Sequence, residues 1–157
     1  MSPKGKNGKY CKVYVVRYRL AIADPDMPQP RYHTVIFVET NDDKSGYIHH
    51  VTGDLVSGMR YQKKPGLEPS RSGTFHSKEL LGKVKENNVP QIEQICSQQP
   101  PPHRQKRYNP KTNKTEPIKP NGEFYKPGEP RARLIKCTEW TLERAVPALQ
   151  AAGILEG

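Results

Sequence analysis

Cys137 is the residue of this chain whose surroundings best suit covalent chemistry. It stands where an amphipathic helix is predicted to begin, directly after Lys136. Unpaired backbone N–H groups and the positive end of the helix dipole stabilise a thiolate there, and a neighbouring ammonium group adds to the effect. Cys137 is therefore a candidate nucleophile. The alternative is a small buried hydrophobic side chain near Trp140.

A nucleophilic thiol needs a histidine with which it can exchange protons. Among the five histidines, His33 is the best placed, because it opens a rigid apolar strand predicted over residues 33–39. His49 and His50 fall on the next predicted strand, where adjacent residues point to opposite faces. One of these two is expected to orient the His33 ring. We name His49 as the candidate catalytic residue beside Cys137 and His33.

The elements that must position these residues follow from hydrophobic patterning and turn residues. Two strands besides 33–39 complete a minimal antiparallel sheet, and the turn cluster at 41–46 joins the second strand to the third. The further strands are predicted at 12–22, 47–52, 58–62 and 131–135. Two short helices are predicted at 77–86 and 89–96.

The clearest helix is predicted over residues 137–152. Five apolar residues share one of its faces, and Gly153 is a suitable C-terminal cap. Pro147 should kink this helix or begin a new first turn within it. The predicted fold class is α+β: a small antiparallel sheet packed against a C-terminal helix that carries a cysteine at its N-terminus.

These features together resemble the papain-like thiol hydrolases of circularly permuted order, above all the deSUMOylating isopeptidase-like (PPPDE) group and the permuted NlpC/P60 group. In that pattern a histidine begins a strand, as in RYHTVIFVE at 31–39, and a cysteine begins a late helix, as in KCTEWTLERAVPALQAAGI at 136–154. The resemblance implies Cys137 as nucleophile and His33 as general base and then acid. It implies a hydrolase or acyl transferase acting on an amide, isopeptide or ester bond of a peptide, protein or small acyl substrate.

Length and composition predict one domain. The chain has 157 residues, of which 33% are hydrophobic, and is expected to form a basic tail at 1–10 and a single domain at 11–157. No apolar run suits a signal peptide or a membrane span, so we expect a soluble cytoplasmic or nuclear protein without membrane contact. The three cysteines lack the spacing of a zinc site or a disulfide framework. Reduced thiols, no metal and no cofactor are expected.

A proline-rich basic loop is predicted at 98–130, and it supports a second function class. Arg104, Lys106, Arg107 and Tyr108 combine cationic charge with an aromatic ring, as in flexible contacts with nucleic acid. The net charge of +10 would also attract nucleic acid or an acidic protein. The alternative to an enzyme is therefore a non-enzymatic basic module that binds nucleic acid or an acidic protein. A solvated loop without a partner is the simpler interpretation of the same residues.

Overall fold

A five-stranded antiparallel sheet forms the centre of the protein. The computed structural model describes residues 9–157, so positions 1–8 of the predicted tail lie outside the described residues. The strand order is β4-β3-β2-β1-β5, and each neighbouring pair is antiparallel. The strands are β1 (Tyr10–Arg19), β2 (Tyr32–Glu39), β3 (Gly46–Asp54), β4 (Gly58–Gly66) and β5 (Phe75–Lys85). The predicted three-stranded nucleus is confirmed, with β2 between β1 and β3.

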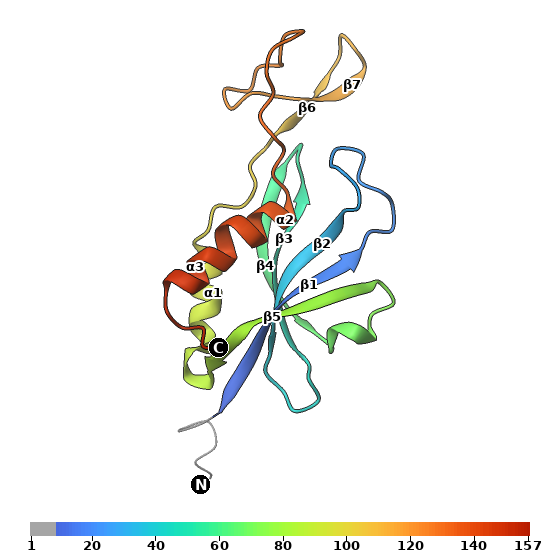
Figure 1. Ribbon diagram of the computed structural model, residues 1–157. Coiled ribbons are helices and arrows are strands. Elements are labelled where there is room, and N and C mark those ends of the chain that lie inside the picture. Colours follow the sequence, from blue (N-terminus) through green and yellow to red (C-terminus); the bar gives the residue numbers. More distant parts are fainter. Residues whose placement is uncertain (1–8) are drawn as a thin grey trace.

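The helices cover one face of this sheet (Figure 1). They are α1 (Val89–Ser97) and a C-terminal helix made of α2 (Cys137–Trp140), the π-helical turn η3 (Thr141–Ala145) and α3 (Val146–Ala151). Trp140 and Leu149 are fully buried against apolar residues of the sheet, Val15 and Ile36 among them. This packing removes a large apolar area from water and holds the helix on the sheet. The predicted α+β class, with Cys137 at the start of the last helix, is confirmed.

Pro147 acts as expected in the C-terminal helix. It occupies the first turn of α3, directly after the π-helical turn. Proline has no N–H to donate to the carbonyl four residues earlier, and its ring crowds that carbonyl. A wider turn relieves the crowding, and the helix then begins again with proline in a tolerated position.

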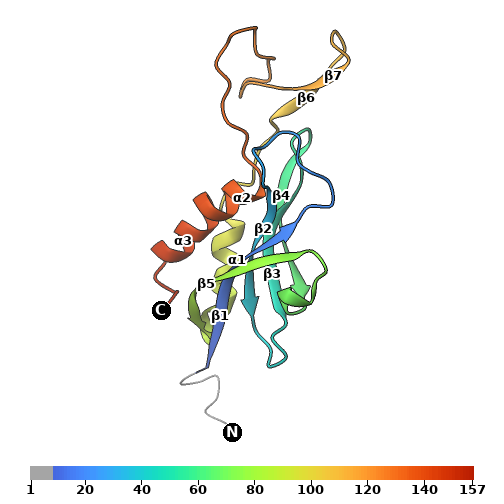
Figure 2. The same cartoon turned by 45° about the vertical axis from the view of Figure 1, so that its right-hand side comes forward.

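The other face of the sheet carries a smaller apolar cluster built on Val16, Val35 and Phe37. The segment from Gly66 to Thr74, which contains the 3₁₀ turn η1 (Pro69–Arg71), stands off the sheet on this side. Figures 1 and 2 show this green segment on the side away from α1 and α3. The two faces therefore differ, since one is covered by helices and the other is partly open.

The helix predicted at 77–86 is wrong, because residues 77–85 lie in β5 and Glu86 begins a 3₁₀ turn. β5 pairs with β1 and is followed by the 3₁₀ turn η2 (Glu86–Asn88). Its partner β1 lies far away along the chain, from Tyr18 opposite Phe75 to Tyr10 opposite Lys85, so local propensity could not indicate the pairing. Gly82 has a φ of 155°, and a Cβ there would meet the Glu156 carbonyl oxygen at 2.6 Å. The chain end thus packs against β5 where only glycine fits.

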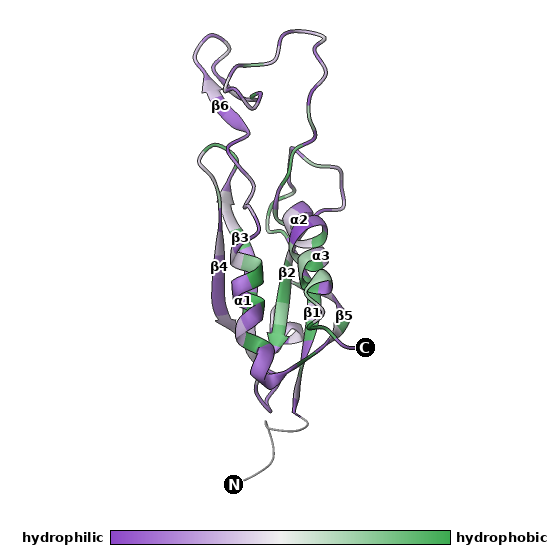
Figure 3. Ribbon diagram, turned by 90° about the vertical axis from the view of Figure 1, so that its left-hand side faces the viewer, coloured by the Kyte–Doolittle hydropathy of each residue, from purple (hydrophilic) through white to green (hydrophobic). Residues whose placement is uncertain are grey.

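The strand predicted at 131–135 is also wrong. The backbone of Ile135 is hydrogen-bonded instead by the Gln105 side chain, whose oxygen accepts from the Ile135 N–H at 2.8 Å and whose amide donates to its carbonyl at 2.7 Å. The predicted loop at 98–130 contains a hairpin of β6 (Lys106–Asn109) and β7 (Lys114–Pro117). We call residues 103–133 the arm. It projects beyond the sheet and is largely hydrophilic, whereas β2 is apolar (Figure 3).

Candidate functional site

Cys137 is the first residue of the C-terminal helix, as predicted, and its side chain is mostly buried. The residue is 8% exposed, and its sulfur lies 3.9 Å from the carbonyl oxygen of Tyr32. Tyr32 is the first residue of β2 and directly precedes His33. The start of the helix therefore lies against the backbone at the start of the histidine strand.

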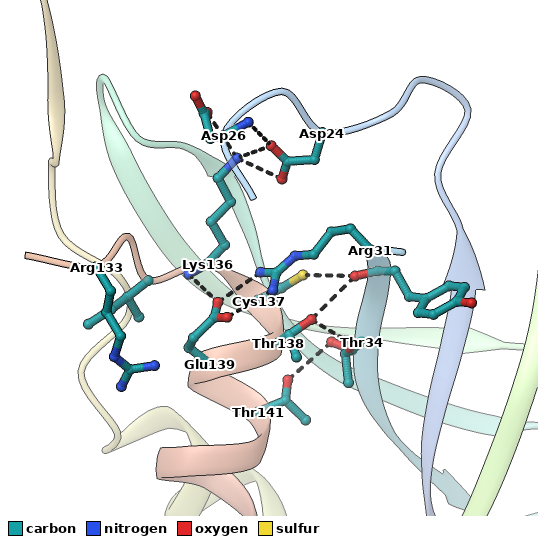
Figure 4. A network of polar contacts seen from close by, with 12 residues as sticks. Asp24, Asp26, Arg31, Thr34, Arg133, Lys136, Cys137, Thr138, Glu139 and Thr141 are labelled. Carbon is teal, nitrogen blue, oxygen red and sulfur yellow. Dashed lines mark hydrogen bonds and ion pairs between the residues drawn. The ribbon is translucent and has the colours of Figure 1, made fainter. Parts of the chain in front are cut away.

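Three hydroxyl groups hold the helix start on β2. The hydroxyls of Thr34 and Thr138 lie 2.8 Å apart, and Thr138 also donates to the Tyr32 carbonyl at 3.3 Å. One turn later, the buried hydroxyl of Thr141 donates to the Thr34 carbonyl at 3.1 Å. On the edge of β2 that faces β3 the ladder ends at Ile36, so the carbonyls of Tyr32 and Thr34 have no partner in β3. The threonine hydroxyls bond to these two carbonyls instead. They fix the position of Cys137 relative to β2 (Figure 4).

The cation beside the thiol is Arg31 and not Lys136. The Lys136 ammonium turns to Asp24 and Asp26, with nitrogen–oxygen distances of 2.8 and 3.2 Å. Arg31 makes a two-pronged ion pair with Glu139, and both bonds measure 2.8 Å. These bonds to Glu139 raise the pKa of Arg31 most, and the nearby Cys137 raises it further. The Arg31 charge, and not that of Lys136, therefore lies near the thiol.

Ion pairs of Asp24 and Asp26 hold the loop between β1 and β2 against the start of the cysteine helix. Glu139 accepts a hydrogen bond from the Lys136 backbone N–H at 2.8 Å, as a first-turn acid does in a helix cap. Asp26 joins Lys136 to Lys106 of the arm, 2.8 Å away. The two lysine partners lower the pKa of Asp26, although burial opposes them. Figure 4 shows this network above the thiol.

His33 takes part in a hydrogen-bonded chain across three strands. Its Nε2 lies 2.8 Å from Nδ1 of His50, and Nε2 of His50 lies 2.9 Å from the Gln62 carbonyl oxygen. With that oxygen as acceptor, His50 must donate through Nε2 and accept through Nδ1, so that His33 donates through Nε2. Nδ1 of His33 then carries the free lone pair. Within residues 9–157 no buried polar side-chain atom lacks a partner, so this unpaired Nδ1 is reached by solvent.

His33 and His50 are neutral at physiological pH. Burial, with smaller effects of His50 and Lys64, lowers the pKa of His33 from 6.5 to about 4. Burial also lowers the pKa of His50, and the positive charge of Lys64 acts in the same direction. A neutral imidazole with a free nitrogen can accept a proton, but a pKa of about 4 makes His33 a weaker base than an exposed histidine.

The structure does not bring the Cys137 thiol and the His33 ring into contact. Thr34 points to the helix, so alternation along β2 sends the His33 ring to the opposite face. The ladder between β2 and β3 runs from Glu39 only as far as Ile36 and His49. Beside His33 the edge of β2 facing β3 is therefore unpaired. The start of the cysteine helix contacts the Tyr32 and Thr34 carbonyls along this edge, and the thiol and the His33 ring lie on opposite faces of β2.

His49, the candidate named from sequence, does not orient His33. Its register partner is Ile36, which lies in the core on the helix side. There Nδ1 of His49 lies 2.6 Å from the Tyr61 hydroxyl, and the Tyr61 ring packs 6.0 Å from Trp140 between centroids. Burial lowers the pKa of His49 to about 4. His49 is a core residue under the cysteine helix, and its neighbour His50 contacts His33.

A pocket of about 450 Å³ opens on the face away from the helices, beside His33 and His50. Val35, Ile48 and Tyr18 contribute to its lining from the sheet, and Leu67 to Arg71 border it from the segment between β4 and β5. Cys137 is not among the lining residues. The two imidazoles therefore lie on the pocket side of β2, whereas the thiol lies on its helix side.

The four binding candidates of the basic loop all lie at the base of the arm or on β6, but two of them are engaged. Lys106 pairs with Asp26, and Arg107 donates to the Gly122 carbonyl at 3.0 Å while stacking over Phe124 at 4.2 Å. Arg104 is exposed, and Tyr108 is 50% exposed. The Tyr108 hydroxyl donates to the Asn113 side chain, so Tyr108 offers a partner its half-exposed ring, and Arg104 offers its exposed side chain.

Sequence reasoning considered His50 but named His49 in its place, and it missed Gln62 and Arg31. Phe37 lies opposite Ile48 in the register, so His50 shares the face of His33. Alternation alone could have selected His50 once that register was fixed, but the turn at 41–46 allows more than one register. Gln62 and Arg31 gave no signal, because their partners lie on other strands or on the helix.

The comparisons with known proteins identify a family. Residues 13–156 match the family described as "Family of unknown function (DUF6540)", and the chain belongs to that family. No curated protein and no solved structure matches the chain. Across residues 9–157 no helix is long and apolar enough to cross a membrane, and no group of three or more metal-binding side chains is found. The cysteines Cys11, Cys96 and Cys137 are free.

Proposed function

We propose that this chain is a cysteine-dependent hydrolase or acyl-transferase-like domain that acts on an amide, isopeptide or ester bond. The observation that carries the proposal is the 3.9 Å contact between the Cys137 sulfur and the Tyr32 carbonyl, one residue before His33. The ring of His33 is in turn held by His50. A nucleophile at a helix start, a neutral base and a group that orients the base are the parts that thiol catalysis needs.

In the proposed reaction the Cys137 thiol gives its proton to Nδ1 of His33. The sulfur attacks the substrate carbonyl, the bond to the leaving amine or alcohol breaks, and His33 returns the proton to that leaving group. Water, or an acceptor amine or alcohol, then attacks the thioester and releases the acyl group. First-turn N–H groups beside Cys137 are suited to hold the carbonyl oxygen as it becomes negative. No cofactor is needed, and peptides, proteins or small acyl compounds are the candidate substrates.

The proposal requires the thiol and the His33 ring to approach each other past the start of β2, where Thr138 and Thr141 of the cysteine helix bond to the carbonyls of Tyr32 and Thr34. These contacts must open or shift before the two side chains can meet. The Arg31 guanidinium supports the thiolate from the helix side. Catalytic contacts often tighten only when a substrate is bound, so a resting state without the thiol–imidazole contact is compatible with catalysis.

An activated ester tests this proposal. With p-nitrophenyl acetate, we expect a burst of nitrophenol and an acetyl group on Cys137, located by peptide mapping. His33→Ala should abolish the burst, whereas Cys96→Ser, at a fully buried thiol on α1, should keep it. Acetylation spread equally over the three cysteines, or a burst that persists in His33→Ala, would contradict the proposal.

Nucleic-acid binding by the arm is the second candidate function. The arm carries nine Lys and Arg residues against three Glu, and it projects away from the body (Figure 3). The exposed Tyr108 beside cationic residues offers a ring on which a base can stack, which favours a single-stranded nucleic acid. An acidic protein is the other partner that such charge would attract, and dependence of the affinity on the Tyr108 ring distinguishes nucleic acid from it.

A further inference from the structure

The pocket beside His33 and His50 has an apolar floor and a cationic border. Val35 and Ile48 line it from the sheet, and Leu67 adds apolar surface from the segment between β4 and β5. Lys64 and Arg71 also line it. Pockets that combine an apolar lining with a few convergent polar groups are the usual sites for small molecules, and 450 Å³ lies within their normal size.

The positive charge of this pocket is not balanced from within. Glu68 is the one acidic lining residue in the described part of the chain. Its carboxylate already accepts hydrogen bonds from Ser70 and contacts the Lys78 ammonium at 3.4 Å. Lys64 and Arg71 have no acidic partner within 4.0 Å anywhere in residues 9–157. A ligand that supplies a negative charge would complete the site.

The position of Lys64 shows where that charge would act. Lys64 lies on β4 opposite Ile48, so its side chain belongs to the same face as His33 and His50. Its positive charge lowers the pKa of both histidines, after the larger effect of burial. An anion near Lys64 would oppose this effect and would raise both pKa values.

We propose that this pocket binds a small organic carboxylate whose apolar part lies on Val35 and Ile48 and whose charge pairs with Lys64. Two independent interactions would then contribute to the binding free energy: burial of the ligand's apolar atoms and a charge-assisted contact with Lys64. The proposal does not depend on the chemistry of Cys137, which is outside the pocket. It adds a binding site to the sheet face that the helices leave open.

Hexanoate is the probe, and titration calorimetry with histidine NMR on the full chain is the measurement. We expect hexanoate to bind, to raise the pKa of His33 and His50, and to bind more tightly than 1-hexanol or inorganic phosphate, each of which offers only one of the two contributions. Lys64→Gln should weaken hexanoate binding by roughly tenfold. Cys137→Ser should bind hexanoate as tightly as the parent does. Hexanoate binding can therefore be confirmed or contradicted independently of the proposed catalysis.

Lys63→Gln is the matched control. Lys63 is adjacent in sequence but belongs to the helix-facing side, where it pairs with Glu93 of α1 at 3.2 Å. This partly exposed pair contributes little to stability, so the variant should fold and bind hexanoate like the parent. Equal weakening in the Lys63 and Lys64 variants, hexanol binding as tight as hexanoate, or no change in the histidine pKa values would each overturn the proposal.

Discussion

His33 and His50 lie on adjacent strands with Nε2 of one 2.8 Å from Nδ1 of the other, and their rings meet edge to face with centroids 5.0 Å apart. Gln62 ends this chain on the third strand. The bond fixes which nitrogen of His33 is free. A role for His33 as a base therefore depends on His50, and the adjacent His49 offers a control on the other face of the same strand.

Replacing His50 should impair catalysis without removing the nucleophile. We expect His50→Ala to lower the acetylation rate of Cys137 by about ten- to a hundredfold, because His33 loses the partner that sets its tautomer. In the parent, ¹⁵N shifts of His33 should report a protonated Nε2 and an unprotonated Nδ1. A His50→Ala variant with the parent rate and the parent His33 shifts would remove His50 from the account.

The pH dependence of stability should report the buried histidines. The pKa of His49 is about 4 in the folded protein and near 6.5 when unfolded, so between these values only the unfolded chain binds the proton. The free energy of unfolding therefore falls as the pH is lowered from about 6.5 to 4, by roughly 3 kcal/mol for this residue. His33 acts in the same direction.

Urea unfolding at several pH values between about 4.5 and 7 measures this effect. In His49→Gln the free energy of unfolding should change less steeply with pH, because unfolding then takes up about one proton fewer. Glutamine does not titrate and can still bond to Tyr61. Asp26 and Glu139 have lowered pKa values, so the stability that their ionised forms contribute is lost only at more acidic pH. An unchanged slope in His49→Gln would show that His49 is not held neutral.

Thr141 should stabilise the docking of the cysteine helix. Its hydroxyl is fully buried and donates to the Thr34 carbonyl, so Thr141→Val keeps the shape but leaves that carbonyl without its partner. We expect a loss of about 1–3 kcal/mol in the free energy of unfolding. Thr112→Val, at an exposed hydroxyl in the arm, is the control and should change stability little. Equal effects of the two substitutions would contradict the role of this bond.

The sequence predicted those parts of the fold that depend on local patterns. The alternation in β1 to β3 and the helical periodicity after Cys137 were sufficient to identify the α+β class and the cysteine helix. β5 was mistaken for a helix because its stability comes from pairing with β1 and from the close approach of Glu156 at Gly82. Such long-range contacts leave no local pattern.

The candidate site could be predicted only in part, for the same reason. Cys137 and His33 were identified from their positions at the ends of elements, but the choice between His49 and His50 needed the register of β2 with β3. The cation beside the thiol is Arg31 and not the expected Lys136, because Lys136 pairs with Asp24 and Asp26. That exchange depends on a loop fold which residue types do not specify.

The arm should bind single-stranded nucleic acid through charge and stacking, if the second candidate function holds. We expect affinity for a fluorescent oligonucleotide to fall steeply as salt rises. Tyr108→Ala should weaken binding by roughly 1–3 kcal/mol. Tyr47→Ala, at an exposed tyrosine on β3 away from the arm, is the control. An acidic protein is the favoured partner if the affinity for the oligonucleotide depends on salt but is the same in Tyr108→Ala, and if an acidic protein binds equally tightly.

The most direct test of the central proposal is the pH dependence of iodoacetamide alkylation at the three cysteines, in the parent and in His33→Ala. Burial raises the pKa of Cys11 and raises that of Cys96 to about 12, so both should react slowly below pH 8. We predict that Cys137 still reacts readily there and that His33→Ala removes this reactivity. A Cys137 as inert as the other two, or a rate that His33→Ala leaves unchanged, would contradict the assignment of Cys137 and His33 as nucleophile and base.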